Sequence, residues 1–501
     1  MTTSVSSEEI SVVQQVVQPA LQSPITTPGV YRIRHTLASR FLFLLICSTI
    51  VISALAYGTV HYWALALFNL GGLTILILWV VDAWQLGQFR ISRNLLQLPL
   101  FGALVLGVLQ LLPLRTNSGS AVGGIGALHT LSLDPYATRL VLVQLGTLFV
   151  YFAAVLVFTD SPHRLHLLVR TITIFGFFLA ILGLTQSFSS PTKVLWMRQL
   201  DQSTAFGPFI NRHHFAGYME LTIALPLGLL FAGAVEKERQ LVYIFAAGVM
   251  GVALIMTGSR GGIISLVAEI LFLAFITVVV RQPHHKRRRG SGRLKSATWR
   301  LVFAVALIGA LFVGVILLGG EWSISRFVDS VNTDDPSTGR AHFWSVTLQM
   351  IKTHPVLGTG LGAFGIIYTG FDSRNGLYRL EQAHNDYLQI FSDAGIVGAL
   401  LALFFVVWLF RQAIARGKSR DDFRRGIALA ALGGCFAVLI HSFFDFTLHT
   451  TANALLFLIM AGLATFNGRV EYVRRRRRGH SSTADESSGL REKIAAQADS
   501  Q

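Results

Sequence analysis

Repeated apolar runs of about 17–22 residues recur along the chain, and each matches the length that crosses the hydrocarbon core of a bilayer. Inside a membrane, continuous apolar segments satisfy their own backbone hydrogen bonds only as helices. Hydrophobic residues make up 52% of the 501 residues and charged residues 14%, against about a quarter charged in a soluble protein. We therefore expect an all-α, polytopic integral membrane protein.

These runs predict about twelve transmembrane helices, so both termini should lie on the same side of the membrane. Eleven of the 42 Lys and Arg residues fall in the loops of one side and the rest on the other side, and this bias places both termini in the cytoplasm. The expected spans cover residues 41–57, 62–81, 95–114, 140–158, 167–188, 215–235, 241–258, 261–280, 301–319, 396–412, 425–446 and 452–467.

The chain divides into three expected parts. Residues 1–40 lack apolar periodicity and should form a disordered cytoplasmic tail. Residues 41–467 should form the transmembrane domain, with one large outer loop at about 320–395. Residues 468–501 should form a basic, disordered cytoplasmic tail, whose arginines at 474–478 suit topology anchoring or anionic lipid. Basic residues confined to such loops and tails argue against nucleic-acid binding.

The outer loop contains a predicted amphipathic helix over residues 338–353. Aromatic and aliphatic side chains fall on one face of this helix, and Pro355 ends it. Ser337 or Thr338 is the expected N-cap, which places Arg340 near a helix N-terminus that favours anions.

Two arginines and one histidine are expected to meet on the outer face. Arg260 sits between two spans with small neighbours, where a charge without an anionic partner is costly. His384 shares the outer loop with Arg340, and histidine is the side chain best suited to take a proton near neutral pH. Guanidinium groups bind phosphate oxygens through paired hydrogen bonds. The set predicts a site for a pyrophosphate leaving group and a hydroxyl nucleophile, and the simpler alternative is a set of interfacial polar residues.

The segment Gly360-Leu361-Gly362-Ala363-Phe364-Gly365 matches the dinucleotide pattern G-x-G-x-x-G. No βαβ unit surrounds it, so we interpret it as a tight turn that brings backbone close to the bilayer or to a substrate.

Three acidic residues of the outer loop suggest a divalent metal site, since carboxylates bind hard cations. Solvated acidic side chains are the simpler interpretation, so no metal site is predicted. The three residues are Asp334, Asp335 and Asp386.

Several segments resemble the O-antigen ligase and polymerase superfamily. They lie between about residues 200 and 465, and in one of them the family more often has Asn in place of the first or second His. The segments are Asn211-Arg212-His213-His214-Phe215-Ala216-Gly217-Tyr218, Thr257-Gly258-Ser259-Arg260-Gly261-Gly262, Gly339-Arg340, Pro355-Val356-Leu357-Gly358-Thr359-Gly360-Leu361-Gly362, Ala383-His384-Asn385-Asp386-Tyr387-Leu388, and Asp445-Phe446-Thr447-Leu448-His449 with Asn453.

The resemblance implies a metal-independent glycosyltransferase of the type C architecture, without cofactors, in the bacterial inner membrane. Such enzymes transfer a glycan from polyprenyl (undecaprenyl) pyrophosphate to a hydroxyl of a lipid or glycan acceptor on the periplasmic face, in lipopolysaccharide or polysaccharide biosynthesis. By motif, Arg260 and Arg340 hold the pyrophosphate and His384 activates or orients the acceptor hydroxyl. Substrate binding is expected at Arg212, His214, Asn385 and Tyr387.

Three alternatives remain open from the sequence. The shared motifs do not separate ligases, polymerases and protein glycosyltransferases. A transporter or flippase for lipid-linked glycan would carry ionisable residues well inside its spans. A non-catalytic scaffold would tolerate replacement of Arg260, Arg340 and His384.

Overall fold

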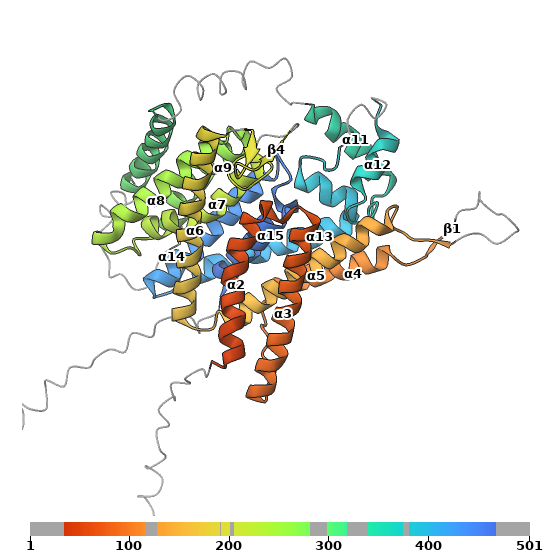
Figure 1. The fold of residues 1–501 in the computed structure, drawn as a ribbon, viewed down its shortest axis with the longest axis horizontal. Coiled ribbons are helices and arrows are strands. Elements are labelled where there is room, and N and C mark those ends of the chain that lie inside the picture. The colour runs from red at the N-terminus through yellow and green to blue at the C-terminus, as the bar shows by residue number, and fades with distance from the viewer. Residues whose placement is uncertain are drawn as a thin grey trace, which may run out of the picture.

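The computed structural model describes residues 35–116, 128–190, 192–200, 205–280, 298–317, 339–373 and 380–466. Within these ranges the protein is all-α with two short hairpins, which confirms the predicted fold class. Figure 1 shows the helices: α2 (Leu37–Leu55), α3 (Tyr62–Leu86), α4 (Gln97–Gln110), α5 (Pro135–Phe158), α6 (Pro162–Ser189), α7 (Arg212–Ala232), α8 (Lys237–Met256), α9 (Arg260–Val279), a helix at Thr298–Leu317, α11 (Arg340–Thr353), α12 (Phe364–Phe371), α13 (Asp386–Arg416), α14 (Asp422–His441) and α15 (Thr451–Thr465).

The remaining elements are short. Strands β1 (Arg115–Thr116) and β2 (Leu128–His129) pair antiparallel, as do β3 (Lys193–Val194) and β4 (Arg198–Gln199). The 3-10 turns η1 and η2 cover Tyr57–Thr59 and Thr447–His449.

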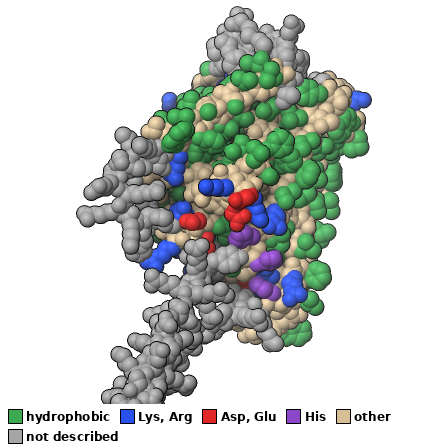
Figure 2. All heavy atoms as spheres, turned by 90° about the vertical axis from the view of Figure 1, so that its left-hand side faces the viewer, with side chains coloured by type: hydrophobic (Ala, Val, Ile, Leu, Met, Phe, Trp, Pro, Cys, Tyr) green, Lys and Arg blue, Asp and Glu red, His purple; other side chains and the backbone are tan. Residues whose placement is uncertain are grey.

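Ten of the described helices are long and apolar enough to cross a membrane, and Gln97–Gln110 and Thr451–Thr465 are shorter apolar helices. Each of the twelve expected spans therefore falls on a helix, although two of these helices are short. On the face in Figure 2, hydrophobic side chains cover a broad region and the charged and histidine side chains gather in a separate zone. This separation suits a protein that contacts lipid on part of its surface.

The expected tails need one correction. Helix α2 begins at Leu37 because the Thr36 hydroxyl caps it by accepting from the Ser39 amide, so residues 37–40 belong to the first helix. Residues 1–34 and 467–501 lie outside the described residues, and their disorder stays a prediction.

Helix α7 is the most buried of the candidate spans, with 94% of its apolar window inside the protein. It packs against α14 at very close range, since a Cβ added at Gly228 would lie 2.4 Å from the Ala430 Cα. Small residues allow membrane helices to approach this closely. The tight pair positions the start of α7 beside the end of α14, where the candidate site lies.

Helices α11 and α12 form a small second core on one side of the bundle (Figure 1). Val346 and Met350 of α11 pack there against Phe364 and Tyr368 of α12. The apolar face expected from the sequence is thus buried against protein. The N-cap expectation of Ser337 or Thr338 was wrong, because α11 begins at Arg340 after Gly339, whose φ of 81° is accessible to glycine.

The glycine-rich turn packs against a break in α13. The helix is interrupted at Gly395, where φ is 61°, and a Cβ there would lie 2.3 Å from the Val356 carbonyl oxygen. The amides of Thr359 and Ile396 donate to the carbonyls of Ser392 and Pro355 at 2.8 and 2.9 Å. The backbone of the glycine-rich turn thus packs directly against the backbone of α13. Helix α13 begins at Asp386, so the last ten residues of the outer loop expected at 320–395 are helical.

Candidate active site

His384 and Asp445 form the first pair of the site. The Nδ1 of His384 lies 3.1 Å from the Asp445 Oδ1, with the histidine side chain 27% exposed and the carboxylate 1% exposed. The His384 backbone has a φ of 50°, which is uncommon for a residue with a side chain. The indole N–H of Trp344 donates to the Ala383 carbonyl at 3.1 Å and thereby ties α11 to this turn. The pair leaves the other ring nitrogen, Nε2, for a substrate.

Asp445 carries a stable negative charge at the centre of the site. Burial alone would raise the pKa of Asp445, but the hydrogen bond with His384 and the charges of His213 and His214 hold that pKa well below its usual range. The carboxylate therefore stays ionised near neutral pH, where it can orient the His384 ring and stabilise its protonated form.

Three arginines stand at the first positions of three helices: Arg212 begins α7, Arg260 begins α9 and Arg340 begins α11. Helix N-termini attract anions, because their backbone N–H groups and dipoles point outward. The Nη1 of Arg212 lies 3.5 Å from where a Cβ on Gly258 would stand, two residues before Arg260. The arrangement concentrates positive charge and N–H donors in one region.

Hydrogen bonds connect the helices that begin with Arg340 and Arg260 to the His384–Asp445 pair. Trp344 of α11 bonds to the carbonyl of Ala383, and Ser259, next to Arg260, bonds to His213, which lies 3.7 Å from Asp445. The two arginines and His384, which the sequence predicted to share a site, thus lie on elements that contact one another. Both arginines are partly exposed, which suits an anionic ligand.

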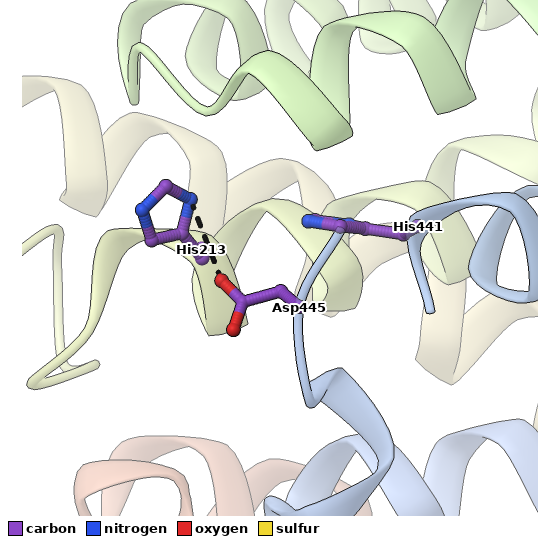
Figure 3. A group of neighbouring side chains, drawn as sticks. All are labelled: His213, His441 and Asp445. Carbon is purple, nitrogen blue, oxygen red and sulfur yellow. Dashed lines mark ion pairs between the residues drawn. The ribbon is translucent and has the colours of Figure 1, made fainter. Parts of the chain in front are cut away.

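A chain of mostly buried polar side chains runs from Asp445 through His213 and Ser259 to His441 and Glu220. Figure 3 labels His213, His441 and Asp445. The His213 Nδ1 lies 3.7 Å from the Asp445 Oδ2 and 2.8 Å from the Ser259 hydroxyl. That hydroxyl lies 3.5 Å from the His441 Nε2, and the His441 Nδ1 lies 2.7 Å from a Glu220 carboxylate oxygen. His441 and Glu220 are fully buried. The chain fixes α7, α9 and α14 relative to one another beneath the site.

Three members of this chain could hold a metal ion. One ligand atom each from His213, His441 and Asp445 lie within 4.8 Å of one another, and two imidazoles with a carboxylate are a donor set that zinc accepts. Figure 3 shows the Asp445 carboxylate next to the His213 ring. Asp334 and Asp335, which were weighed from the sequence, lie outside the described residues.

A second histidine–aspartate pair joins the segment between α14 and α15 to the start of α13. The His449 Nδ1 lies 2.8 Å from the Asp386 Oδ1, and the Ser442 hydroxyl donates to the Asp386 Oδ2 at 2.7 Å. Asp386, weighed from the sequence as a metal ligand, is thus engaged with two protein side chains. Burial alone would lower the pKa of His449, but its hydrogen bond with Asp386 and the charge of that carboxylate raise it.

Two residues predicted to bind substrate have polar groups engaged in the fold. Asn385 caps α13 and donates from its amide to the Phe443 carbonyl, and the Tyr387 hydroxyl donates to the Leu439 carbonyl at 2.7 Å. A third, His214, is 8% exposed, and its buried Nε2 has no hydrogen-bond partner among the described residues.

Sequence reasoning assigned no role to several residues that complete the site. Asp445, Phe446 and His449 were part of a segment noted only for family resemblance. Glu220 and Glu269 could have been identified from the sequence, because an ionisable residue inside a membrane span is unusual and indicates a function. The remaining members of the buried chain are His213, Ser259 and His441.

Residues 245–403 match the family model described as O-antigen ligase. This match confirms the resemblance to that superfamily, and it supports glycan transfer of the ligase or polymerase type by a membrane protein. Arg260, Arg340 and His384 lie inside the matched residues, whereas Arg212 and Asp445 lie outside them. No curated protein matches the chain.

Proposed function

We propose that this protein, with its O-antigen ligase region, transfers a glycan from polyprenyl pyrophosphate, undecaprenyl pyrophosphate in bacteria, to an acceptor hydroxyl. The reaction takes place on the outer, periplasmic face of the inner membrane. One observation supports the proposal: a buried carboxylate, Asp445, holds the imidazole of His384 on a turn that contacts α11, the helix that Arg340 begins.

The proposed reaction is an in-line displacement. The Nε2 of His384 takes the proton of the acceptor hydroxyl while the acceptor oxygen forms a bond to the anomeric carbon of the donor sugar. The bond from that carbon to the pyrophosphate breaks, and its electron pair leaves with the pyrophosphate. Asp445 stabilises the imidazolium that results, because its negative charge lies against the His384 Nδ1.

The arginines act on the leaving group. Negative charge grows on the departing pyrophosphate oxygen, so fixed guanidinium groups stabilise the transition state more than the bound substrate. Arg260 and Arg340 supply this charge, and Arg212 supplies a further contact. The proposal places no metal ion or cofactor at the reacting atoms.

A transporter of lipid-linked glycan is the second candidate, because ionisable residues do lie inside spans. Glu220 of α7 and Glu269 of α9 are fully buried, and each lies about 12–14 Å along its helix from the arginine that begins it. Glu220 bonds to His441 of the buried chain, which favours a role in supporting the site.

The deciding experiment is reconstitution of the purified protein in nanodiscs with a polyprenyl-pyrophosphate glycan and three acceptors: a lipid A core, a glycan repeat unit and a peptide. Mass spectrometry should find a product with one of the acceptors, and that acceptor separates ligase, polymerase and protein glycosyltransferase. Movement of the donor across proteoliposome membranes without any new glycosidic bond would instead support the transporter.

A further inference from the structure

Phe446 lies at the centre of three imidazole rings. Its ring centroid is 4.8 Å from that of His384 and 4.9 Å from that of His214, with interplanar angles of 75° and 78°. The His449 ring is 6.4 Å away at 74°. All three ring pairs are T-shaped, so one apolar ring lies among three imidazoles.

The two more exposed histidines are held in the same way. His384 and His449 each place Nδ1 against a buried carboxylate, at 3.1 Å from Asp445 and 2.8 Å from Asp386. Their side chains are 27% and 33% exposed, and the two carboxylate side chains are 1% and 4% exposed. Each pair therefore leaves Nε2 as the ring atom for a ligand, and both rings neighbour Phe446.

The backbone of Phe446 is tied to the same carboxylate. Its N–H donates to the Asp445 Oδ1 at 2.9 Å, and that oxygen also contacts His384. Phe446 is partly exposed, whereas His214 is 8% exposed. An aromatic ring with hydrogen-bonding groups around it is the chemistry that recognises a sugar ring, whose C–H face is apolar and whose edge carries hydroxyls.

The neighbours of Phe446 indicate which substrate it would meet. His384, the proposed base for the acceptor hydroxyl, has its ring centroid 4.8 Å from that of Phe446. His449, whose ring lies 6.4 Å away, is paired with the buried carboxylate of Asp386. Phe446 therefore lies beside the group that is proposed to act on the acceptor.

We propose that Phe446 is the platform on which a sugar ring of the acceptor stacks, with His384 at the hydroxyl that reacts and His449 bonding a second hydroxyl of the same ring. This inference rests on the proposed function, and it assigns the acceptor class: a glycan, either free or lipid-linked, presenting a pyranose or furanose ring.

The test compares Phe446→Leu, Phe446→Trp and His449→Gln with the wild type. Phe446→Leu keeps apolar volume but loses the aromatic face, so the acceptor KM should rise roughly 3–10-fold, the range that aromatic contacts supply, while the donor KM stays unchanged. Phe446→Trp should keep the acceptor KM near the wild-type value, and His449→Gln should raise it. Phe101→Leu, at a phenylalanine 56% exposed on α4, is the matched control and should behave as wild type.

Acceptor binding without donor gives a second measurement that does not depend on transfer. Saturation-transfer NMR with the acceptor glycan should show contacts with the wild type that weaken in Phe446→Leu, with all variants matched for thermal melting. If the wild type makes no product yet binds the glycan in this way, the proposed function fails and the platform stands. If Phe446→Leu changes the donor KM alone, or changes neither constant nor binding, the acceptor platform is wrong.

Discussion

The imidazole of His384 lies 3.1 Å from the carboxylate of Asp445, across 61 residues of sequence. This contact joins the turn before α13 to the loop between α14 and α15. Through it the carboxylate of Asp445 sets the orientation of the His384 ring. Arg340 begins α11, and Trp344 of that helix bonds to the same turn, so the proposed base lies beside the helix that carries one of the proposed donor groups.

The first prediction concerns the arginines. Arg260→Lys and Arg340→Lys keep the charge but lose the planar group that binds two phosphate oxygens at once. We expect each to lower turnover by on the order of 10²–10³, the usual effect of losing one contact to the transition-state charge. The measurement is the rate of pyrophosphate-linked glycan consumption in nanodiscs. Arg239→Lys, at a side chain 69% exposed, is the control. Wild-type rates in both site variants would remove the arginines from the mechanism.

The second prediction separates acceptor activation from donor binding. His384→Ala should lower turnover by about 10²–10⁴, as expected for loss of a general base, while donor affinity stays near wild type. Asp445→Asn should lower turnover through misorientation of the ring, and Asp445→Glu should recover part of it.

Donor affinity and turnover are measured side by side at matched folded protein. The assignment of roles is wrong if His384→Ala abolishes donor binding while the lysine variants at 260 and 340 leave both quantities unchanged.

The third prediction concerns orientation in the membrane. Reporter fusions after Gly290 and after Gly479 should give a cytoplasmic signal, and a fusion after Asn375 should give an external one, because the basic loops remain inside. An external signal at Gly290 would place the site on the cytoplasmic face and contradict the proposed reaction.

The fourth prediction concerns metal. Since guanidinium groups are proposed to carry the charge of the pyrophosphate, transfer should persist after treatment with a chelator and dialysis. A loss of activity that added divalent cation restores would contradict this. The ligands would then be sought first at His213, His441 and Asp445, by metal analysis of His441→Gln beside the wild type.

The fifth prediction concerns pH and His449. Its pKa is raised in the folded protein above the unfolded value of about 6.5, so the protonated form contributes stability that is full below about pH 6.5. That contribution is lost as pH rises through the folded pKa. The melting temperature of the wild type should therefore exceed that of His449→Gln most at pH 5.5–6, and the difference should shrink toward pH 9.

Asp386→Asn provides the comparison, because it removes the carboxylate that raises the pKa. When Asp386→Asn is present, the effect of His449→Gln on the melting temperature should depend much less on pH. If the melting temperature of the wild type exceeded that of His449→Gln by more at high pH than at low pH, a raised pKa of His449 would be contradicted.

Much of the fold could be predicted from the sequence, because the governing periodicity is local. An apolar run of membrane length becomes a helix wherever it lies in the chain, so all twelve expected spans fall on helices. Helix starts were less predictable: α2 begins at Leu37 and α11 after Gly339, since caps depend on a few hydrogen bonds and backbone angles.

The site followed from the sequence only in part. Arg260, Arg340 and His384 could be proposed as site residues because a charged or titratable side chain at the membrane boundary is costly and therefore indicates a function. Their partner Asp445 lies inside a segment where many polar residues occur, and nothing local marks it as the carboxylate that His384 contacts.

The sequence by itself determined that this is a helical membrane protein and which cations stand at the ends of its spans, because hydropathy and charge act residue by residue. Only the tertiary structure decided that His384 meets Asp445, that His441 meets Glu220 across 221 residues, and that Phe446 lies among three histidines. Such contacts depend on how closely helices pack, as α7 does on α14, and packing is a property of pairs of surfaces that no single segment contains.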